Sequence, residues 1–456
     1  MKKSIFSSDL HRKASRLRIF LARVKKQIIS SCKAEPHFIK NSSGLLIPNK
    51  KRYSAWTRKL YNDLGPNRRF ISAKSSLKKA LAMQKTHQPP NHTKQLFLDI
   101  SLFIKSDRKT GVQRVVRNIL SEFLLQPPHG YHIEPVYGSE GGIYRYARSD
   151  EPIDTFKGDI FLGLDLIPPL IRRYKKTYQH FKANGTLLYF IVYDLIPIRY
   201  PHFFSKRLKY SFSCWLKQIM TQADGVICIS RSVMNELNEW LQKNPLDSNP
   251  SIGWFHLGAN IDLIQPNTEK SHTINFDAIK QFPSVLMVST IEPHKGYEAA
   301  LAAFENLWEQ GQPINLVIVG KQGTKVENLV KALKKHPLKN KHLFWFPQID
   351  DTSLLALYET CQGLLMASVC EGFGLALIEA AYHKLPILAR DIPIFREVAS
   401  QHAAYFTQDN PEMLGQEILT WLDNIKQGKA PLSEKIPYLN WTQSYQQLIN
   451  ILIADK

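Results

Sequence analysis

Two acidic residues, Glu371 and Glu379, have the types and spacing that could do chemistry. They lie in the segment 369–381, where an apolar run typical of a buried strand is followed by glycines and then by residues that favour a helix. Gly372 would let the backbone approach a ligand, and a helix beginning near Gly374 would direct free amides and its positive dipole end at an anion. This order predicts a phosphate site. The alternative is that both glutamates are simply solvated.

A lysine and further glycines follow two earlier predicted strands. Lys295 lies in the loop 290–296, and 320–323 forms the next strand-to-helix loop. In an open α/β sheet, ligands bind beyond the carboxyl ends of the strands, where such loops gather. A lysine ammonium could add a charge-assisted hydrogen bond to a phosphate, of about 1.5–3 kcal/mol. The alternative is an exposed lysine with no ligand.

The first half of the chain has corresponding loops at 109–113, 163–165 and 193–202. Asp194 interrupts an otherwise apolar predicted strand, and a carboxylate there is costly unless it is hydrogen-bonded or faces a cleft. We therefore count Asp194 among the candidate site residues. A structural role in orienting the following turn is the alternative.

Short apolar strands alternate with helices in both halves, which predicts two doubly wound parallel sheets with a cleft between them. In the first half we expect strands at 96–100, 131–136, 159–163, 186–192 and 225–229, and helices at 112–124, 206–223 and 233–242. The polar stretch 266–274 is the predicted linker. In the second half we expect strands at 284–289, 315–320, 342–346, 363–368 and 386–389, and helices at 296–310, 325–335, 351–360, from about 374 and from 411.

Nearly all of the net charge of +21 belongs to an amino-terminal extension. Residues 1–94 contain 23 Lys and Arg against 3 Asp and Glu, which leaves 37 basic and 36 acidic residues for 95–456. Within this extension, residues 9–31 predict a basic amphipathic helix. Its apolar stripe is Leu10, Ala14, Leu17, Leu21, Val24 and Ile28.

Such a helix is typical of an element that lies on an anionic membrane surface, where each Lys or Arg contributes about 1 kcal/mol. It could instead contact a partner protein, dock on the protein's own body or bind nucleic acid. Because aromatic residues are sparse among the basic residues of 1–40, we expect no nucleic acid. Residues 34–94 have weak periodicity and indicate a partly ordered linker.

Five cysteines without paired spacing favour neither a disulfide framework nor a zinc site, and they indicate a reducing compartment. The basic start is followed by further basic residues rather than by an apolar core, so we expect no signal peptide. No apolar run reaches the 18 or so residues that span a bilayer. The sequence therefore predicts a cytoplasmic protein, which residues 9–31 could hold on the inner face of the membrane.

Residues from about 95 to 450 resemble the retaining nucleotide-sugar glycosyltransferases of family four, which have the two-domain GT-B fold. Within that family the chain is most similar to the bacterial mannosyl- and rhamnosyltransferases of polysaccharide assembly. The two glutamates around Gly372, Phe373 and Gly374 match the family signature. Further similar segments are 288–296, 316–320, 109–114, 391–397 and Trp441.

This resemblance implies a nucleoside-diphosphate sugar as donor. Glu371 would contact hydroxyls of the donor sugar, Glu379 would accept from the ribose, and Lys295 would neutralise the departing diphosphate. The implied catalytic residues are Glu371 and Lys295; the donor-binding residues are Glu379, Gly372, Phe373, Gly374, Leu375, Gly320, Lys321 and Thr290; and the amino-terminal cleft residues are Thr110, Gly111, Tyr193 and Asp194. The family needs no metal or other cofactor, and its members retain the sugar configuration without a protein nucleophile.

Two positions depart from the family pattern. Many members have an arginine a few residues before the lysine, where this chain has 289–294 without one; Lys321 or His294 could replace it. Tyr193 stands where members often have a histidine beside the aspartate, so we assign no catalytic base.

The sequence thus predicts an α/β protein of the GT-B class with a basic extension at 1–94. An amino-terminal Rossmann-like acceptor domain would span 95–265, a donor domain 266–435, and a helix within 436–456 could pack back on the first domain. We expect transfer of a hexose, with mannose as first choice, to a glycan or lipid-linked acceptor. A glycosidase is disfavoured because an uncharged glycoside needs no phosphate clamp. A nucleotide-sugar sensor or scaffold tethered by the extension is the other alternative.

Overall fold

The computed structural model describes residues 38–40, 46–48, 93–105, 110–139, 141–168, 171–259, 274–408 and 410–453, with side chains from residue 93 onward. The predicted amphipathic helix at 9–31 and the predicted linker up to residue 273 lie outside these residues. Within the extension, β1 (Phe38–Lys40) and β2 (Leu46–Pro48) pair antiparallel.

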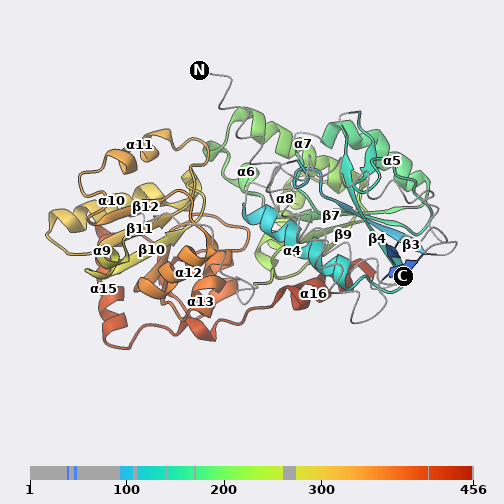
Figure 1. Cartoon of the computed structure of the whole chain (residues 1–456). Helices are drawn as coiled ribbons and strands as arrows, with labels where there is room; N and C mark the ends of the chain where they lie inside the picture. The colour runs from blue at the N-terminus through green and yellow to red at the C-terminus, as the bar shows by residue number, and fades with distance from the viewer. Residues whose placement is uncertain are drawn as a thin grey trace, which may run out of the picture.

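A seven-stranded sheet forms the core of what we call the first lobe, at the right of Figure 1. Its order is β5-β4-β3-β6-β7-β8-β9, and every neighbouring pair is parallel except β4 and β5. The strands are β3 (Lys94–Asp99), β4 (Tyr131–Gly138), β5 (Tyr144–Tyr146), β6 (Ile160–Gly163), β7 (Leu187–Val192), β8 (Gly225–Cys228) and β9 (Ser251–Trp254). The helices are α4 (Gly111–Leu125), α5 (Lys175–Ala183), α6 (Ile196–Arg199), α7 (Lys206–Gln222) and α8 (Arg231–Lys243), with 3₁₀ helices at Ile171–Tyr174 and Pro201–Phe203.

A six-stranded, all-parallel sheet of order β12-β11-β10-β13-β14-β15 forms the second lobe, at the left of Figure 1. Its strands are β10 (Ser284–Val288), β11 (Asn315–Val319), β12 (Leu343–Phe346), β13 (Gly363–Met366), β14 (Ile387–Arg390) and β15 (Ala404–Phe406). Its helices are α9 (Phe276–Lys280), α10 (Tyr297–Glu309), α11 (Glu327–Lys335), α12 (Asp351–Thr360), α13 (Leu375–Tyr382), α14 (Pro393–Ala399) and α15 (Pro411–Lys426), with 3₁₀ helices at Pro293–Lys295 and Ser433–Lys435.

The strands of both sheets are mostly buried and apolar, as expected for parallel sheets covered by helices. Polar side chains begin several helices by accepting a free backbone N–H: Thr110 caps α4, Ser205 caps α7, Ser230 caps α8 and Asp350 caps α12. These caps fix where each helix starts relative to the loop before it. Of these caps, Thr110 belongs to a loop with candidate residues, the one at the start of α4.

The order of strands places a topological switch point at one strand in each lobe. In the first lobe β3 lies between β4 and β6, and in the second lobe β10 lies between β11 and β13. Loops that leave adjacent strands in opposite directions open a crevice at such a point. The loops after β10 and β13, which carry Lys295 and Glu371, flank the crevice of the second lobe.

The last helix, α16 (Trp441–Ile453), returns to the first lobe and lies beside α4 (Figure 1). The Tyr445 ring meets the Phe123 ring edge-on at 4.9 Å between centroids, and its hydroxyl donates to the Gln126 carbonyl. Ser444 Oγ donates to the His256 carbonyl at 2.6 Å. Trp441, Tyr445, Leu448 and Leu452 are buried. Helix α16 is thus part of the first lobe's core.

Among the described residues, no helix combines the length and hydropathy needed to cross a bilayer.

Candidate functional site

An ion pair between Lys295 and Glu371 lies at the switch point of the second lobe. Lys295 Nζ donates to Glu371 Oε1 at 2.6 Å, and Ser368 Oγ donates to the same oxygen at 2.9 Å. The two charged side chains are 14% and 12% exposed. Burial favours their neutral forms, but the pair outweighs it, so the pKa of Lys295 lies above and the pKa of Glu371 below its ordinary value. Both groups are therefore charged at neutral pH.

Glu379 is bound from both lobes. It lies on α13 and is 8% exposed. Tyr358 of α12 donates its hydroxyl to Oε2 at 2.7 Å, and Arg114, in the first turn of α4, pairs with Oε1. This ion pair joins residues 265 positions apart and raises the pKa of Arg114. The carboxylate is thereby held in one orientation where the lobes meet.

Two glycines shape the loop between these glutamates, each for a different reason. Gly374 precedes α13 with φ of 95°, the left-handed region that glycine adopts without strain. The helix starts there, as the sequence predicts. At Gly372 a Cβ atom would lie 2.1 Å from the Tyr193 carbonyl oxygen, so this glycine permits close approach to the first lobe. Ser230 Oγ donates to the Gly372 carbonyl at 2.9 Å across the same junction.

Phe373 and Leu375 flank Gly374 and differ in their exposure. Phe373 is 4% exposed, and its ring packs edge-on against His256 of the first lobe at 5.5 Å between centroids. Leu375 is half-buried at the first position of α13. The predicted donor-binding role of Phe373 therefore rests on its backbone, because its side chain contacts the other lobe.

Asp194 faces the charged groups of the second lobe, whereas Tyr193 does not. Asp194 Oδ1 accepts from Ile196 N–H at 3.0 Å, so it also orients the following turn. Burial raises the pKa of Asp194 to about 6; the Ile196 N–H and Lys295 act to lower it, and Glu371 acts to raise it. Tyr193 is 3% exposed and donates its hydroxyl to the Leu164 carbonyl at 2.7 Å. The Tyr193 ring therefore belongs to the core of the first lobe, whereas its backbone carbonyl lies at the junction with Gly372.

The loops with Thr290 and Lys321 are joined by backbone hydrogen bonds. Ile291 N–H donates to the Lys321 carbonyl at 2.9 Å, and Gly323 N–H donates to the Ile291 carbonyl at 2.9 Å. A Cβ atom at Gly320 would lie 1.7 Å from the Ser289 carbonyl oxygen, so glycine is required for this contact. His294 is buried, which together with Lys295 lowers its pKa to about 4. A neutral imidazole is a poor substitute for the missing arginine.

The first lobe contributes the start of α4. Thr110 Oγ1 accepts from Gln113 N–H at 3.4 Å, and Gly111 is exposed as the first helical residue. Arg114 follows within the first turn and reaches Glu379, so the start of α4 lies near α13. Thr110 and Gly111 therefore lie at the end of α4 that is nearer the second lobe.

A second contact between the lobes was not predicted as functional. Glu397 of α14 accepts from the backbone N–H groups of Arg231 and Ser232 at 2.8 and 2.7 Å, and from His256 Nε2 at 2.7 Å. A carboxylate at the first turn of α8 is favoured by the free amides and the helix dipole. The sequence shows that the segment 391–397 is similar to the family, but the contact that Glu397 makes with the first lobe depends on how the two lobes are arranged.

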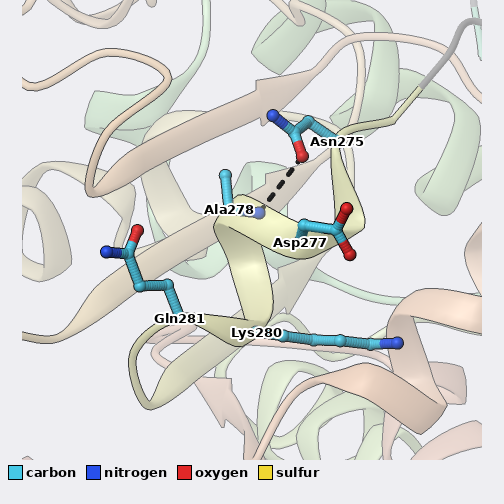
Figure 2. Close-up of a pocket in the computed structure, with 5 residues that line it drawn as sticks. All are labelled: Asn275, Asp277, Ala278, Lys280 and Gln281. Carbon is cyan, nitrogen blue, oxygen red and sulfur yellow. Dashed lines mark hydrogen bonds between the residues drawn. The ribbon is translucent and has the colours of Figure 1, made fainter.

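Among the described residues, no group of three or more His, Cys, Asp and Glu side chains could hold a metal ion. A depression of about 620 Å³ lies beside the short helix α9 (Figure 2). It is lined by Asn275, Asp277, Ala278, Lys280 and Gln281, and Asn275 accepts from Ala278 N–H at 3.1 Å. None of these residues belongs to the predicted site.

Comparison with known proteins gives a family match and named relatives. Residues 272–433 match the family described as glycosyl transferases group 1. The serotype-specific mannosyltransferase WbdA of Escherichia coli is 39% identical over 379 residues, covering 79% of this chain and 46% of that protein. The O-antigen chain mannosyltransferase RfbU of Salmonella typhimurium is 26% identical over 219 residues, covering 48% of this chain and 56% of that protein. The chain spans about half the length of the curated relatives it matches.

Solved structures share the fold at low sequence identity. Anabaena Alr3699/HepE in complex with UDP-glucose gives a TM-score of 0.56 at 15% identity, covering 80% of this chain and all of that chain. Sucrose-phosphate synthase from Thermosynechococcus elongatus gives a TM-score of 0.52 at 16% identity, covering 80% of this chain and 100% of that chain. The predicted two-domain GT-B arrangement is confirmed.

Proposed function

We propose that this chain, whose residues 272–433 match the group 1 glycosyl transferases, transfers a hexose from a nucleoside-diphosphate sugar to a glycan or lipid-linked acceptor in polysaccharide synthesis. Mannose is our first choice, because the relatives WbdA and RfbU are both named mannosyltransferases. The observation that carries the proposal is the buried Lys295–Glu371 pair at the switch point, one loop away from the start of α13.

The donor would lie along the loop 371–374 and α13. Both hydrogen bonds to Glu371 end on Oε1, so Oε2 is the oxygen that would accept from a hydroxyl of the donor sugar. Glu379 has one partner on each oxygen, and each carboxylate oxygen has two lone pairs. The second lone pairs of Glu379 would accept from the ribose hydroxyls.

Lys295 would stabilise the leaving group. Its ammonium has three N–H donors, of which Glu371 takes one, so two remain for oxygens of the diphosphate. Negative charge grows on the diphosphate as the bond to the sugar breaks, and a cation held in place before the reaction stabilises that charge without reorganisation. Glu371 would thus act twice, by accepting from the sugar and by orienting Lys295.

The proposal extends to a metal-independent reaction that retains the configuration of the sugar. Its support is that Lys295 and the free amides at the start of α13 would supply the positive charge that a diphosphate needs. Retention would follow from attack by the acceptor on the same face that the diphosphate leaves, and we assign no nucleophile or base. Peripheral contact of residues 9–31 with the inner face of the membrane, where a lipid-linked acceptor would lie, is part of the same proposal.

Replacing Glu371 by glutamine tests the assignment. We expect the rate of sugar transfer to fall by a factor of about 10²–10³, the usual effect of losing one preorganised polar contact to the reacting groups. The donor is first chosen from GDP-, UDP- and dTDP-sugars by thermal shift, since a ligand at 100 times its Kd stabilises by about 2.7 kcal/mol. Glu298→Gln, an exposed residue at the start of α10, is the matched control. Wild-type turnover by the Glu371→Gln protein would refute the assigned role.

A further inference from the structure

Positive charge is concentrated in one part of the first lobe. Residues 166–223 contain ten Lys and Arg and a single acidic residue, Asp194, although residues 95–456 as a whole are nearly balanced. Asp194 is partly buried at the candidate site and accepts from Ile196 N–H. The outer surface of this segment therefore carries basic residues without acidic neighbours in its own sequence.

Three elements of this segment contact one another: the 3₁₀ helix Ile171–Tyr174, α5 and α7. Figure 1 shows α5 and α7 along the same edge of the first lobe. Their aromatic side chains, such as Tyr178 and Trp215, are buried in the core, so the basic side chains point outward. We define the basic face as Arg172, Arg173, Lys175, Lys176, Lys206, Arg207, Lys209 and Tyr210, all exposed except Lys209, which is half-buried.

Tyr210 gives this face an aromatic centre. It is 60% exposed, and the Arg172 guanidinium lies 4.8 Å from the centre of its ring while donating to its hydroxyl. Arg172 also donates to Cys214 Sγ at 3.1 Å. Tyrosine with nearby cations is typical of residues at the level of lipid headgroups, where the ring is half apolar and half hydrated.

The basic face begins beside the candidate site. The rings of Phe203 and Phe204 lie 6.1 and 6.0 Å from the ring of His294, which directly precedes Lys295. Lys325 of the second lobe donates to the carbonyls of His202 and Phe204, both at 3.0 Å. Helix α7 starts two residues after Phe204. A surface bound to the basic face would therefore lie next to the junction of the lobes.

We propose that the basic face docks the first lobe on an anionic lipid bilayer, so that the junction of the lobes is held near the membrane surface. Two helices and one exposed tyrosine suit a flat surface of negative charge. A single-stranded nucleic acid would need several exposed aromatic side chains along a groove. The inference concerns where the protein is held and goes beyond the proposed reaction, since it adds a second contact in the folded part of the chain.

The test is sedimentation of the full chain with vesicles of phosphatidylcholine alone or with about one third phosphatidylglycerol, at about 0.1 M salt. The face variant is Lys175→Glu, Lys176→Glu and Arg207→Glu. Since each basic residue near an anionic surface contributes about a fivefold factor, we expect at least a tenfold weaker affinity for the anionic vesicles. The matched control reverses three exposed lysines of α11 in the second lobe: Lys331, Lys334 and Lys335.

The expected result is weaker binding by the face variant, near wild-type binding by the α11 variant, and unchanged circular dichroism for both. Wild-type affinity of the face variant would overturn the proposal and would assign any vesicle binding to the remainder of the chain. An equal loss in both variants would also overturn it, because net charge alone would then explain the binding. The proposal would also be overturned if the face variant lost oligonucleotide binding but kept vesicle binding, because the surface would then be a nucleic-acid site. Transfer to a soluble acceptor tests the enzyme separately.

Discussion

Replacing Arg114 by methionine would remove the ion pair that fixes Glu379 from the opposite lobe. Methionine keeps much of the length of the arginine side chain but has no donor. Glu379 would then keep only the Tyr358 hydroxyl, at 2.7 Å from Oε2, among the partners described above. The carboxylate is 10% exposed, so water would solvate it poorly in the arrangement seen here.

The expected cost follows from the exposure of the two partners. Removing one member of a fully buried pair costs about 3–5 kcal/mol, whereas an exposed pair contributes about 0–1 kcal/mol. Arg114 is 36% exposed and Glu379 10%, so this pair lies between these limits. We expect Arg114→Met to lower the free energy of unfolding by about 1–2 kcal/mol. Arg396→Met breaks the more exposed pair with Asp391 at 2.7 Å, and should cost less than about 0.5 kcal/mol.

The assay is urea unfolding of the wild type, Arg114→Met, Glu379→Gln and the double variant. The double-mutant cycle cancels effects that do not involve the pair, and we expect a coupling energy of about 1 kcal/mol. Tryptophan fluorescence reports the unfolding, because Trp215 and Trp441 are buried in the first lobe and Trp421 in the second. A coupling energy below about 0.3 kcal/mol would refute the reasoning, since the two residues would then act independently.

Two further predictions concern Asp194 and Gly372. Burial raises the pKa of Asp194 from its ordinary 3.8 to about 6, so the folded state holds a proton that the unfolded state has lost, and stability falls as pH rises through that window. The free energy of unfolding should therefore decline between about pH 4 and 6, and Asp194→Asn should make that decline smaller by about 1–3 kcal/mol. Urea unfolding at both pH values measures it, and a decline equal to that of the wild type would contradict the prediction. Gly372→Ala would place a Cβ 2.1 Å from the Tyr193 carbonyl oxygen and should destabilise by about 1–3 kcal/mol, whereas Gly111→Ala meets nothing within 4 Å and should be nearly neutral. Equal urea midpoints for the two alanine variants would contradict the close approach of the lobes.

Continuous apolar runs made most of the fold predictable. Strands such as β10 and β11 are short, apolar and buried on both faces, so their sequence identifies them without knowledge of their neighbours. The three strands β5, β9 and β15 have only three or four residues, and β5 pairs antiparallel at an edge, so no apolar run marked them. Helix α5 is mostly polar and was missed for the same reason.

The sequence names the candidate residues one by one but not the pairs that they form in the structure. Lys295 and Glu371 lie in loops after predicted strands and Glu379 lies in the helix after the second loop, yet the pairs they form link residues 76 and 265 positions apart. The Arg114–Glu379 pair depends on the packing of one lobe against the other, and the Lys295–Glu371 pair on the packing of two loops at one edge of the second sheet, and no local pattern encodes either arrangement. Arg114 had a signal, since it lies four residues after the cap Thr110, within a segment already recognised at 109–114.

The position of α16 has a consequence for biosynthesis. Because Tyr445 and Leu448 of α16 complete the packing around α4, the first lobe lacks part of its core until α16 has been made. About 200 residues separate β9 from the end of α16, which at about 5–20 residues per second is a delay of about 10–40 s. During that interval the apolar side of α4 that α16 later covers is open to water or to a chaperone. The first lobe is thus completed only after the second lobe has been made.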